Sequence, residues 1–331
     1  MINIADVTVG AQYGDEAKGK VTHFLARHGD YTHVLRWSGG CNAGHTIFHN
    51  GQKFVTHHIP AGVFFGIKSI IGPGCVVNVK YFLDEVKELQ AAGIQIRGNL
   101  FIAENAHVVT DKHIQEENAE NKIGTTRRGN GPAYRDKYFR KGILASEIPQ
   151  LNAYMIDVYE EFYNNENPVR VLCEGAQGFG LDIVWGDYPY VTSSHCTLSG
   201  VFQNAINPKW LRDVWGAAKI YETYVGAKKF ELDDNIFKKL RELGEEYGAT
   251  TGRPRQCNWL NLNDLIKSVK INSINKLVIN KMDVMRKLGV WKLYHDGDTL
   301  DLKTEEEMKN YIVSNLPENT EVYFSEHKDK I

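Results

Sequence analysis

The 331-residue chain has little cysteine, and its cysteines are scattered. No two of the five form a CxxC pair (Cys41, Cys75, Cys173, Cys196 and Cys257). The histidines are dispersed as well, and the adjacent pair His57 and His58 lacks the spacing of zinc ligands. We therefore expect free thiols in a reducing compartment, and neither a disulfide framework nor a structural zinc site.

The chain also lacks long apolar runs, a linker and an excess of one charge. No stretch approaches the roughly 20 apolar residues that span a bilayer, and the N-terminal MINIADVTVG is not a charged-then-apolar signal sequence. A formal net charge of −2 and a pI of about 6.6 give no electrostatic reason to bind nucleic acid or an anionic membrane. With 42% hydrophobic residues and no low-complexity segment, the sequence predicts one globular domain over residues 1–331, located in the cytoplasm.

A glycine-rich loop follows the first expected strand. An apolar run ends at Gly10, and the loop GAQYGDEAKGK leads into a helix with Val21, Phe24 and Leu25 on one face. Backbone N–H groups and a helix N-terminus in such a loop can face an anion. The segment from Gly14 to Lys20 has the GxxxxGK spacing of a P-loop, but Val21 replaces the magnesium-binding Ser or Thr. The loop predicts phosphate binding, with a Gly-rich turn and solvated charges as the alternative.

A second glycine-rich loop, GGCNAGHT, covers residues 39–46. Glycines let a backbone approach a ligand closely, Asn42 offers an amide, and His45 can exchange a proton near neutral pH. A histidine alone is more often an ordinary satisfied side chain. Two such loops near the start of one chain favour a nucleotide site.

Polar blocks follow two further apolar runs, in a pattern of alternating helices and strands. EGAQG follows residues 169–173, and NKMD follows residues 277–279. A helix is expected over residues 81–92, with Gly93 as its stop. Ligands of open α/β sheets bind beyond the carboxyl ends of strands, where both blocks would lie. Asp283 of NKMD can accept two hydrogen bonds from guanine, which adenine cannot donate, so it predicts selection of GTP.

These segments together resemble the adenylosuccinate synthetase family, whose pattern is close to GxQWGDEGKGK followed by NAGHT. Further blocks occur in the family's order: IGTTRRGNGPAYRDK, EGAQGFGLDI, YPYVTSS, GATTGRPR and NKMD. The resemblance implies an α/β fold with a large, mostly parallel central sheet, flanking helices and a P-loop-like phosphate loop. It also implies a ligase that couples L-aspartate to C6 of IMP with hydrolysis of GTP.

The family's mechanism assigns the catalytic residues. By resemblance, Asp15 takes the N1 proton of the purine, O6 attacks the γ-phosphoryl group, and His45 donates to the developing charge. Lys18 and Lys20 screen phosphate charge, and the side chain of Glu16 is expected to be structural. Mg²⁺ would be held by Asp15 and the carbonyl of Gly44.

The resemblance implies three sets of substrate contacts. The purine monophosphate would meet Asn42, Ala43, Thr126, Gln177, Thr192 and Arg253, with Arg140 from a second subunit of a homodimer. Aspartate would be held by Thr250, Thr251, Arg253 and Arg255, since arginine forks pair with carboxylates. GTP would meet the phosphate loop and later residues: Gly14, Glu16, Ala17, Lys18, Gly19, Lys20, Gly44, Thr46, Arg255, Lys281, Asp283 and Ser325.

Some segments depart from the family pattern. The family's STGPD corresponds to YFSEHKDKI, in which only Ser325 and Asp329 are similar, and its RVGAGPFPTE corresponds to YVGAKKFELD. The chain is also short for the family and in length resembles archaeal members and phage enzymes that act on dGMP. IMP is the favoured substrate because Asp15 is present, and dGMP is the alternative. A GTPase-like regulator would not need the second loop, and a non-catalytic binding protein should have lost Asp15 or His45.

Overall fold

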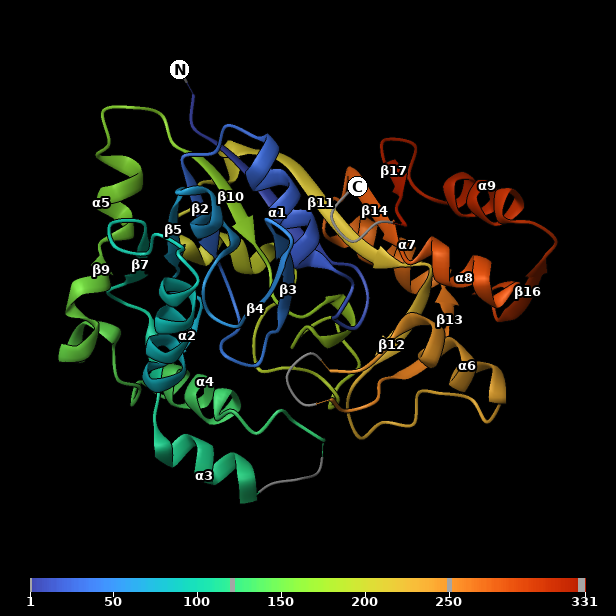
Figure 1. The fold of residues 1–331 in the computed structure, drawn as a ribbon, viewed down its shortest axis with the longest axis horizontal. Helices are drawn as coiled ribbons and strands as arrows, with labels where there is room; N and C mark the ends of the chain where they lie inside the picture. The colour runs from blue at the N-terminus through green and yellow to red at the C-terminus, as the bar shows by residue number, and fades with distance from the viewer. Residues whose placement is uncertain (1, 120–122, 249–251, 327–330) are drawn as a thin grey trace.

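Nine strands form the central sheet among the residues that the computed structural model describes, which are 2–119, 123–248, 252–326 and 331. Every neighbouring pair in this sheet is parallel, so the expected large, mostly parallel sheet is confirmed. From edge to edge (Figure 1) the order is β17 (Glu321–Phe324), β14 (Lys276–Asn280), β11 (Leu211–Lys219), β1 (Ile4–Gly10), β10 (Arg170–Glu174), β2 (His33–Arg36), β5 (Lys68–Ile71), β7 (Leu100–Ala103) and β9 (Met155–Ile156).

Smaller sheets are attached to this centre. The strands β12 (Tyr221–Tyr224), β13 (Gln256–Asn261), β15 (Trp291–His295) and β16 (Asp298–Leu302) form a mixed sheet. The strands β3 (His45–His49) and β4 (Gln52–Thr56) form a hairpin, and β6 (Val76–Asn78) pairs with β8 (His107–Val109).

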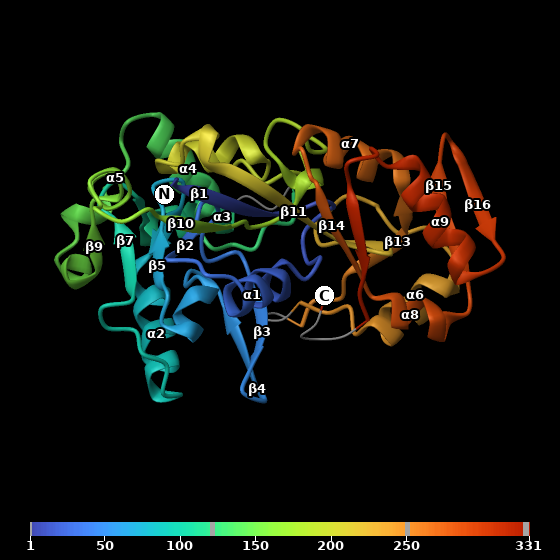
Figure 2. The same cartoon turned by 90° about the horizontal axis from the view of Figure 1, so that it is seen from above.

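The helices surround the sheets. They are α1 (Lys18–His28), α2 (Val79–Ala91), α3 (Asp111–Ala119), α4 (Asn130–Tyr138), α5 (Val158–Tyr163), α6 (Asn235–Gly244), α7 (Leu262–Ile271), α8 (Met282–Leu288) and α9 (Glu305–Asn315). Short 3₁₀ turns are η1 (Ala61–Phe65), η2 (Ala145–Glu147), η3 (Pro149–Tyr154), η4 (Phe179–Leu181), η5 (Leu198–Asn204) and η6 (Pro208–Trp210). Figures 1 and 2 show α6, α8 and α9 at one end of the central sheet and α2 and α5 at the other. None of the helices that the structure describes combines the length and hydrophobicity needed to cross a membrane.

Local sequence explains several of these boundaries. Helix α2 begins two residues before the expected position because Asn78 caps it, accepting a hydrogen bond from Tyr81 N at 3.0 Å. Gly93, with a φ of +84°, stops the chain from continuing the helix. In β1, Ala5, Val7 and Val9 are buried on one face and Asp6 and Thr8 on the other, as expected for a strand whose two faces are both covered.

The parallel arrangement gathers the loops that carry the sequence blocks. Five neighbouring strands, β14, β11, β1, β10 and β2, point their carboxyl ends to one edge of the sheet. The loops that leave β1, β2, β10 and β14 contain the GAQYGDEAKGK, GGCNAGHT, EGAQG and NKMD segments. Segments more than 250 residues apart in sequence therefore meet at one edge.

Candidate active site

The first loop leaves β1 and enters α1 through a left-handed turn. Gly14, Asp15 and Ala17 have φ angles of +89°, +59° and +68°. Successive residues in such conformations turn backbone N–H groups toward a common point, which suits an anion. The carboxylate of Glu16 is buried and accepts hydrogen bonds from Gln12 N at 3.1 Å and Gly14 N at 2.7 Å. The Glu16 side chain therefore shapes the loop from inside.

Lysines on this loop are held by polar partners. Lys18 Nζ lies 2.5 Å from the Glu16 carboxylate, and Lys20 Nζ donates to Ser325 Oγ at 2.8 Å. The second contact brings the C-terminal segment onto the phosphate loop. Asp329, the other tail residue that matches the family pattern, lies outside the described residues.

Asp15 contacts the expected aspartate loop. Its carboxylate is 37% exposed and lies 3.0 Å from Arg255 Nε. Arg255 Nη1 in turn donates to Glu246 at 2.6 Å, and the buried Lys219 Nζ lies 2.9 Å from the same carboxylate. Burial opposes ionisation of Glu246, but Lys219, Lys281 and Arg255 outweigh it and lower its pKa to about 2. A buried charged network thus holds the arginine that touches Asp15.

The second loop packs against the first and against the EGAQG loop. A Cβ placed on Gly19 would lie 2.9 Å from His45 Cβ, and one on Gly39 would lie 3.0 Å from Gln177 Oε1. Side chains larger than hydrogen would force these loops apart. Within the loop, Gly40 N donates to Asn42 Oδ1 at 3.2 Å, and His57 Nδ1 contacts Ala43 O at 2.6 Å.

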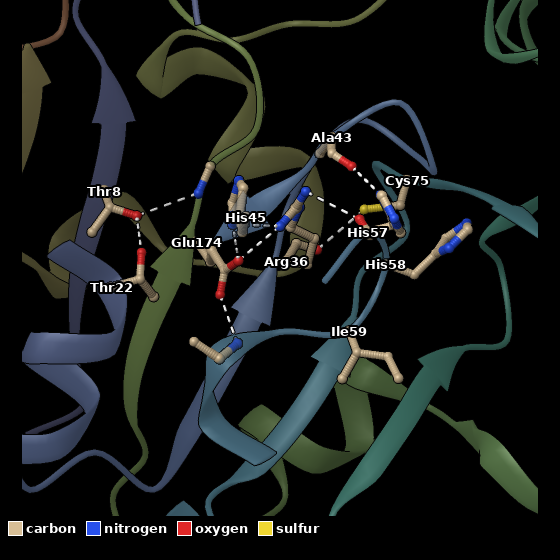
Figure 3. Close-up of polar contacts among 12 residues, drawn as sticks. Thr8, Thr22, Arg36, Ala43, His45, His57, His58, Ile59, Cys75 and Glu174 are labelled. Atoms are coloured by element: carbon tan, nitrogen blue, oxygen red, sulfur yellow. Dashed lines mark hydrogen bonds and ion pairs between the residues drawn. The ribbon is translucent and has the colours of Figure 1, made fainter. Parts of the chain in front are cut away.

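His45 is part of a buried polar cluster (Figure 3). Its Nδ1 lies 2.6 Å from Glu174 Oε1, and Arg36 Nη1 donates to the same oxygen at 2.7 Å. Burial, together with the charge of Arg36, lowers the pKa of His45 to about 4 despite the opposing effect of Glu174. Burial opposes ionisation of Glu174 too, but His45 and Arg36 outweigh it and lower its pKa to about 2. The resting cluster therefore contains a neutral imidazole and an ionised carboxylate.

The NKMD segment is hydrogen-bonded to the first loop. Asn280 Nδ2 donates to Glu16 O at 2.9 Å and to Ala218 O at 3.1 Å. Lys281 has a φ of +69° and donates to Gly244 O at 2.7 Å. Asp283 lies in the first turn of α8, 3.5 Å from Lys287, with 35% of its side chain exposed.

The remaining expected contacts lie on loops around this edge. Arg253 donates to Gly124 O at 3.4 Å and Gly226 O at 3.3 Å, so the GATTGRPR and IGTTRRG loops meet. Gln177 has a φ of +53° and follows β10. Thr192 is half-buried, and Thr46 is in β3; Thr126 and Arg140 are exposed. Thr250 and Thr251 lie outside the described residues.

Comparison with known proteins decides the family. A sequence model of adenylosuccinate synthetase matches residues 7–167 and 144–309. The chain belongs to the adenylosuccinate synthetase family. Adenylosuccinate synthetases from Halothermothrix orenii and Aquifex aeolicus are 38% and 39% identical to it, and each alignment covers 89% of this chain and 81% of the relative.

Solved structures agree on the fold. The fully ligated adenylosuccinate synthetase from Plasmodium falciparum superposes with a TM-score of 0.78 at 33% identity, covering 93% of this chain and 86% of that one. The cyanophage S-2L succinoaminodeoxyadenylate synthetase, bound to dGMP and dATP, gives a TM-score of 0.72 at 20% identity, covering 95% and 99%. The second similarity supports the fold alone.

Four buried residues of this adenylosuccinate synthetase family member were not expected at the site: Arg36, Glu174, Lys219 and Glu246. Each ends a strand or precedes a loop of the site. Glu174 contacts both Arg36 and His45, and Glu246 contacts both Lys219 and Arg255. A charged residue at the end of an apolar run, such as Arg36 at the end of HVLR, is the sequence feature that could have indicated them.

The oxygen atoms near the first loop can be compared with the ligands that the magnesium ion implied by the family resemblance requires. Mg²⁺ prefers oxygen ligands and is usually held by one or two carboxylates together with substrate phosphates. In the described part of the chain, no group of three or more His, Cys, Asp and Glu side chains could hold a metal. Asp15 is an accessible carboxylate on a phosphate loop, and Gly44 supplies a carbonyl on the facing loop. These oxygen donors fit a magnesium ion shared with a nucleotide.

Proposed function

We propose that this protein joins L-aspartate to C6 of IMP and hydrolyses GTP to GDP and phosphate, which gives adenylosuccinate. The observation that carries the proposal is the 3.0 Å contact between Asp15 and Arg255. The contact supports the proposal because the residue proposed as the base of the first step lies beside the arginine proposed to bind the aspartate carboxylate in the second, although 240 residues separate them in sequence.

The reaction is difficult because an oxide is a very poor leaving group from C6. Asp15 removes the N1 proton, so that O6 can attack the γ-phosphorus of GTP and GDP can leave. The aspartate amine then attacks C6, and the oxygen departs within inorganic phosphate. Lys18 and Lys20 counter the charge of the phosphates. Asp15 and the Gly44 carbonyl would hold Mg²⁺, which neutralises negative charge on the transferring group when bound.

His45 acts on the phosphoryl group. In the free protein its imidazole is neutral, and Nδ1 contacts Glu174. Donation from Nε2 therefore requires a proton on that nitrogen in the substrate complex, where the phosphate charges favour the cation.

IMP is favoured over dGMP as the purine. Relatives at 38% and 39% identity are named adenylosuccinate synthetase, whereas the dGMP-bound cyanophage structure is only 20% identical. The divergent segment after β12 forms an aromatic cluster, in which the rings of Tyr13 and Phe230 lie 5.1 Å apart and Lys228 lies over Tyr13. This segment is where the pocket could differ from that of the relatives.

The test is a substrate panel. Purified protein is given Mg²⁺, aspartate and either GTP or ATP, with IMP, GMP or dGMP, and the products are identified by mass. We expect adenylosuccinate from IMP with GTP. A preference for dGMP would mean that dGMP, and not IMP, is the substrate. Equal rates with ATP and GTP would refute the role of Asp283. Release of phosphate without aspartate or a purine nucleotide would favour a GTPase.

The active form is a homodimer in which Arg140 reaches the partner's site. Arg140 is exposed with a φ of +61°, and its neighbours Tyr138 and Phe139 are 63% and 66% exposed, which suits a contact surface. Mixing Arg140→Leu with Asp15→Asn subunits should restore about a quarter of the wild-type sites if subunits exchange at random. No recovery in mixed dimers that are shown to form would contradict a shared site.

A further inference from the structure

We infer that Glu174 and Arg36 position His45 for catalysis, because both fix the orientation of its ring and the Glu174 carboxylate keeps a proton on Nδ1. The kinetic consequence rests on the proposed function. The tautomer itself can be measured whatever reaction the protein catalyses.

The two positioning residues are neighbours in the central sheet. Glu174 ends β10, Arg36 ends β2, and the parallel register pairs them directly. Side chains of directly paired residues leave the same face of a sheet, so both reach the second loop together. Figure 3 shows the guanidinium and the carboxylate meeting at the imidazole of His45.

Every oxygen of the Glu174 carboxylate has a donor. Oε1 lies 2.6 Å from His45 Nδ1 and 2.7 Å from Arg36 Nη1, and Oε2 accepts from Ala61 N at 2.8 Å. The residue is fully buried. These three donors and the burial hold the carboxylate in this position.

These contacts select one tautomer of His45. A carboxylate only accepts hydrogen bonds, so Nδ1 carries a proton. Arg36 Nη1 also lies 3.1 Å from Nδ1, and because a guanidinium only donates, this contact competes with a proton on Nδ1. The contact of Nδ1 with the Glu174 carboxylate is shorter, at 2.6 Å, and favours the proton on Nδ1. Nε2 is therefore the nitrogen that remains for a ligand.

The ring is also confined from the side of the phosphate loop. A Cβ on Gly19 would lie 2.9 Å from His45 Cβ and 3.3 Å from Cγ, so the start of α1 is in close contact with the histidine. Lys18 adds a positive charge near the ring. The imidazole is thus held between β10, β2 and α1.

The first experiment measures the tautomer by NMR with ¹⁵N-labelled histidine. The His45 signals are assigned as those lost in His45→Asn. We expect a proton on Nδ1 in the wild type and a shift toward Nε2–H in Glu174→Gln. An Nε2–H ring in the wild type would overturn the inference even if the protein is an adenylosuccinate synthetase, and this measurement needs no variant at position 174 to fold.

The second experiment separates positioning from binding. Glu174→Gln should lower kcat on the order of 10²–10⁴-fold, because it removes the charged acceptor that holds the Nδ1–H side of the ring while Nε2 donates to the phosphate. KM for IMP and GTP should change little. Glu174→Asp keeps an acceptor and should recover part of the kcat and the Nδ1–H signal. Equal loss in both variants with an unchanged tautomer would mean that Glu174 is only structural.

A matched control is available on the same strand β2. Its first residue, His33, contacts the Glu161 carboxylate through Nε2 at 2.8 Å, at the opposite end of the sheet from the site. Glu161→Gln also removes a carboxylate from a histidine, and it should change neither the His45 signals nor kcat. An equal loss of kcat in this control would show that the Glu174 effect is not specific to the site.

Discussion

Removal of Arg255 should weaken aspartate binding far more than GTP binding. Arg255 is 13% exposed and already bridges two carboxylates, those of Asp15 at 3.0 Å and Glu246 at 2.6 Å. The buried Glu246 keeps the guanidinium in place, so a substrate carboxylate can replace Asp15 without moving the arginine. A hydrogen bond to a charged group contributes about 1.5–3 kcal/mol, so Arg255→Leu should raise KM for aspartate about 10–150-fold.

Initial rates at varied aspartate and varied GTP measure both constants in the same preparation. Arg212→Leu is the matched control, since Arg212 also pairs with a buried carboxylate, Asp6, but lies away from the strand ends that carry the loops. The control should leave both KM values unchanged. Equal increases in KM for aspartate and for GTP in Arg255→Leu would refute the reasoning, because they would make this loop a structural element and not a clamp for the amino acid.

Three other substitutions test the remaining roles. Asp15→Asn should abolish turnover and leave the thermal unfolding midpoint nearly unchanged, because the side chain is 37% exposed; activity within about tenfold of wild type would contradict its role as the base. His45→Asn should lower kcat on the order of 10²–10⁴-fold, whereas a change confined to KM would limit His45 to binding. Glu246 has a pKa lowered to about 2, so its carboxylate stabilises the fold above the unfolded-state pKa and this contribution is lost as the pH falls toward 2. In urea unfolding, the stability deficit of Glu246→Gln should therefore narrow below about pH 4.5, and a deficit that widens there would contradict this sign.

The position of the site was predictable because it depends on local pattern. Glycine-rich polar segments directly after apolar runs predicted loops at strand ends, and the strands β1, β10 and β14 lie where these runs were found. Parallel pairing then brings the loops to one edge whatever their separation in sequence. The five cysteines are free, as expected.

The supporting contacts were not predictable because they depend on register and tertiary packing. Nothing in the sequence pairs Arg36 with Glu174 until β2 and β10 are known to be neighbours. The Glu246 network likewise joins a segment after α6 to β11 and the loop before β13. Short strands such as those of the β12–β13–β15–β16 sheet carry too little periodicity to be recognised alone. The homodimer, the magnesium ion and the individual ligand contacts stay predictions.

The most direct test of the central claim follows the oxygen atom on C6. IMP labelled with ¹⁸O at O6 is converted with GTP and aspartate, and the phosphate and the nucleotide product are analysed by mass. A reaction through a 6-phosphoryl intermediate transfers the label into inorganic phosphate, in an amount equal to the adenylosuccinate formed. Adenylosuccinate formation with unlabelled phosphate, or phosphate release with the label retained on IMP, would contradict the account.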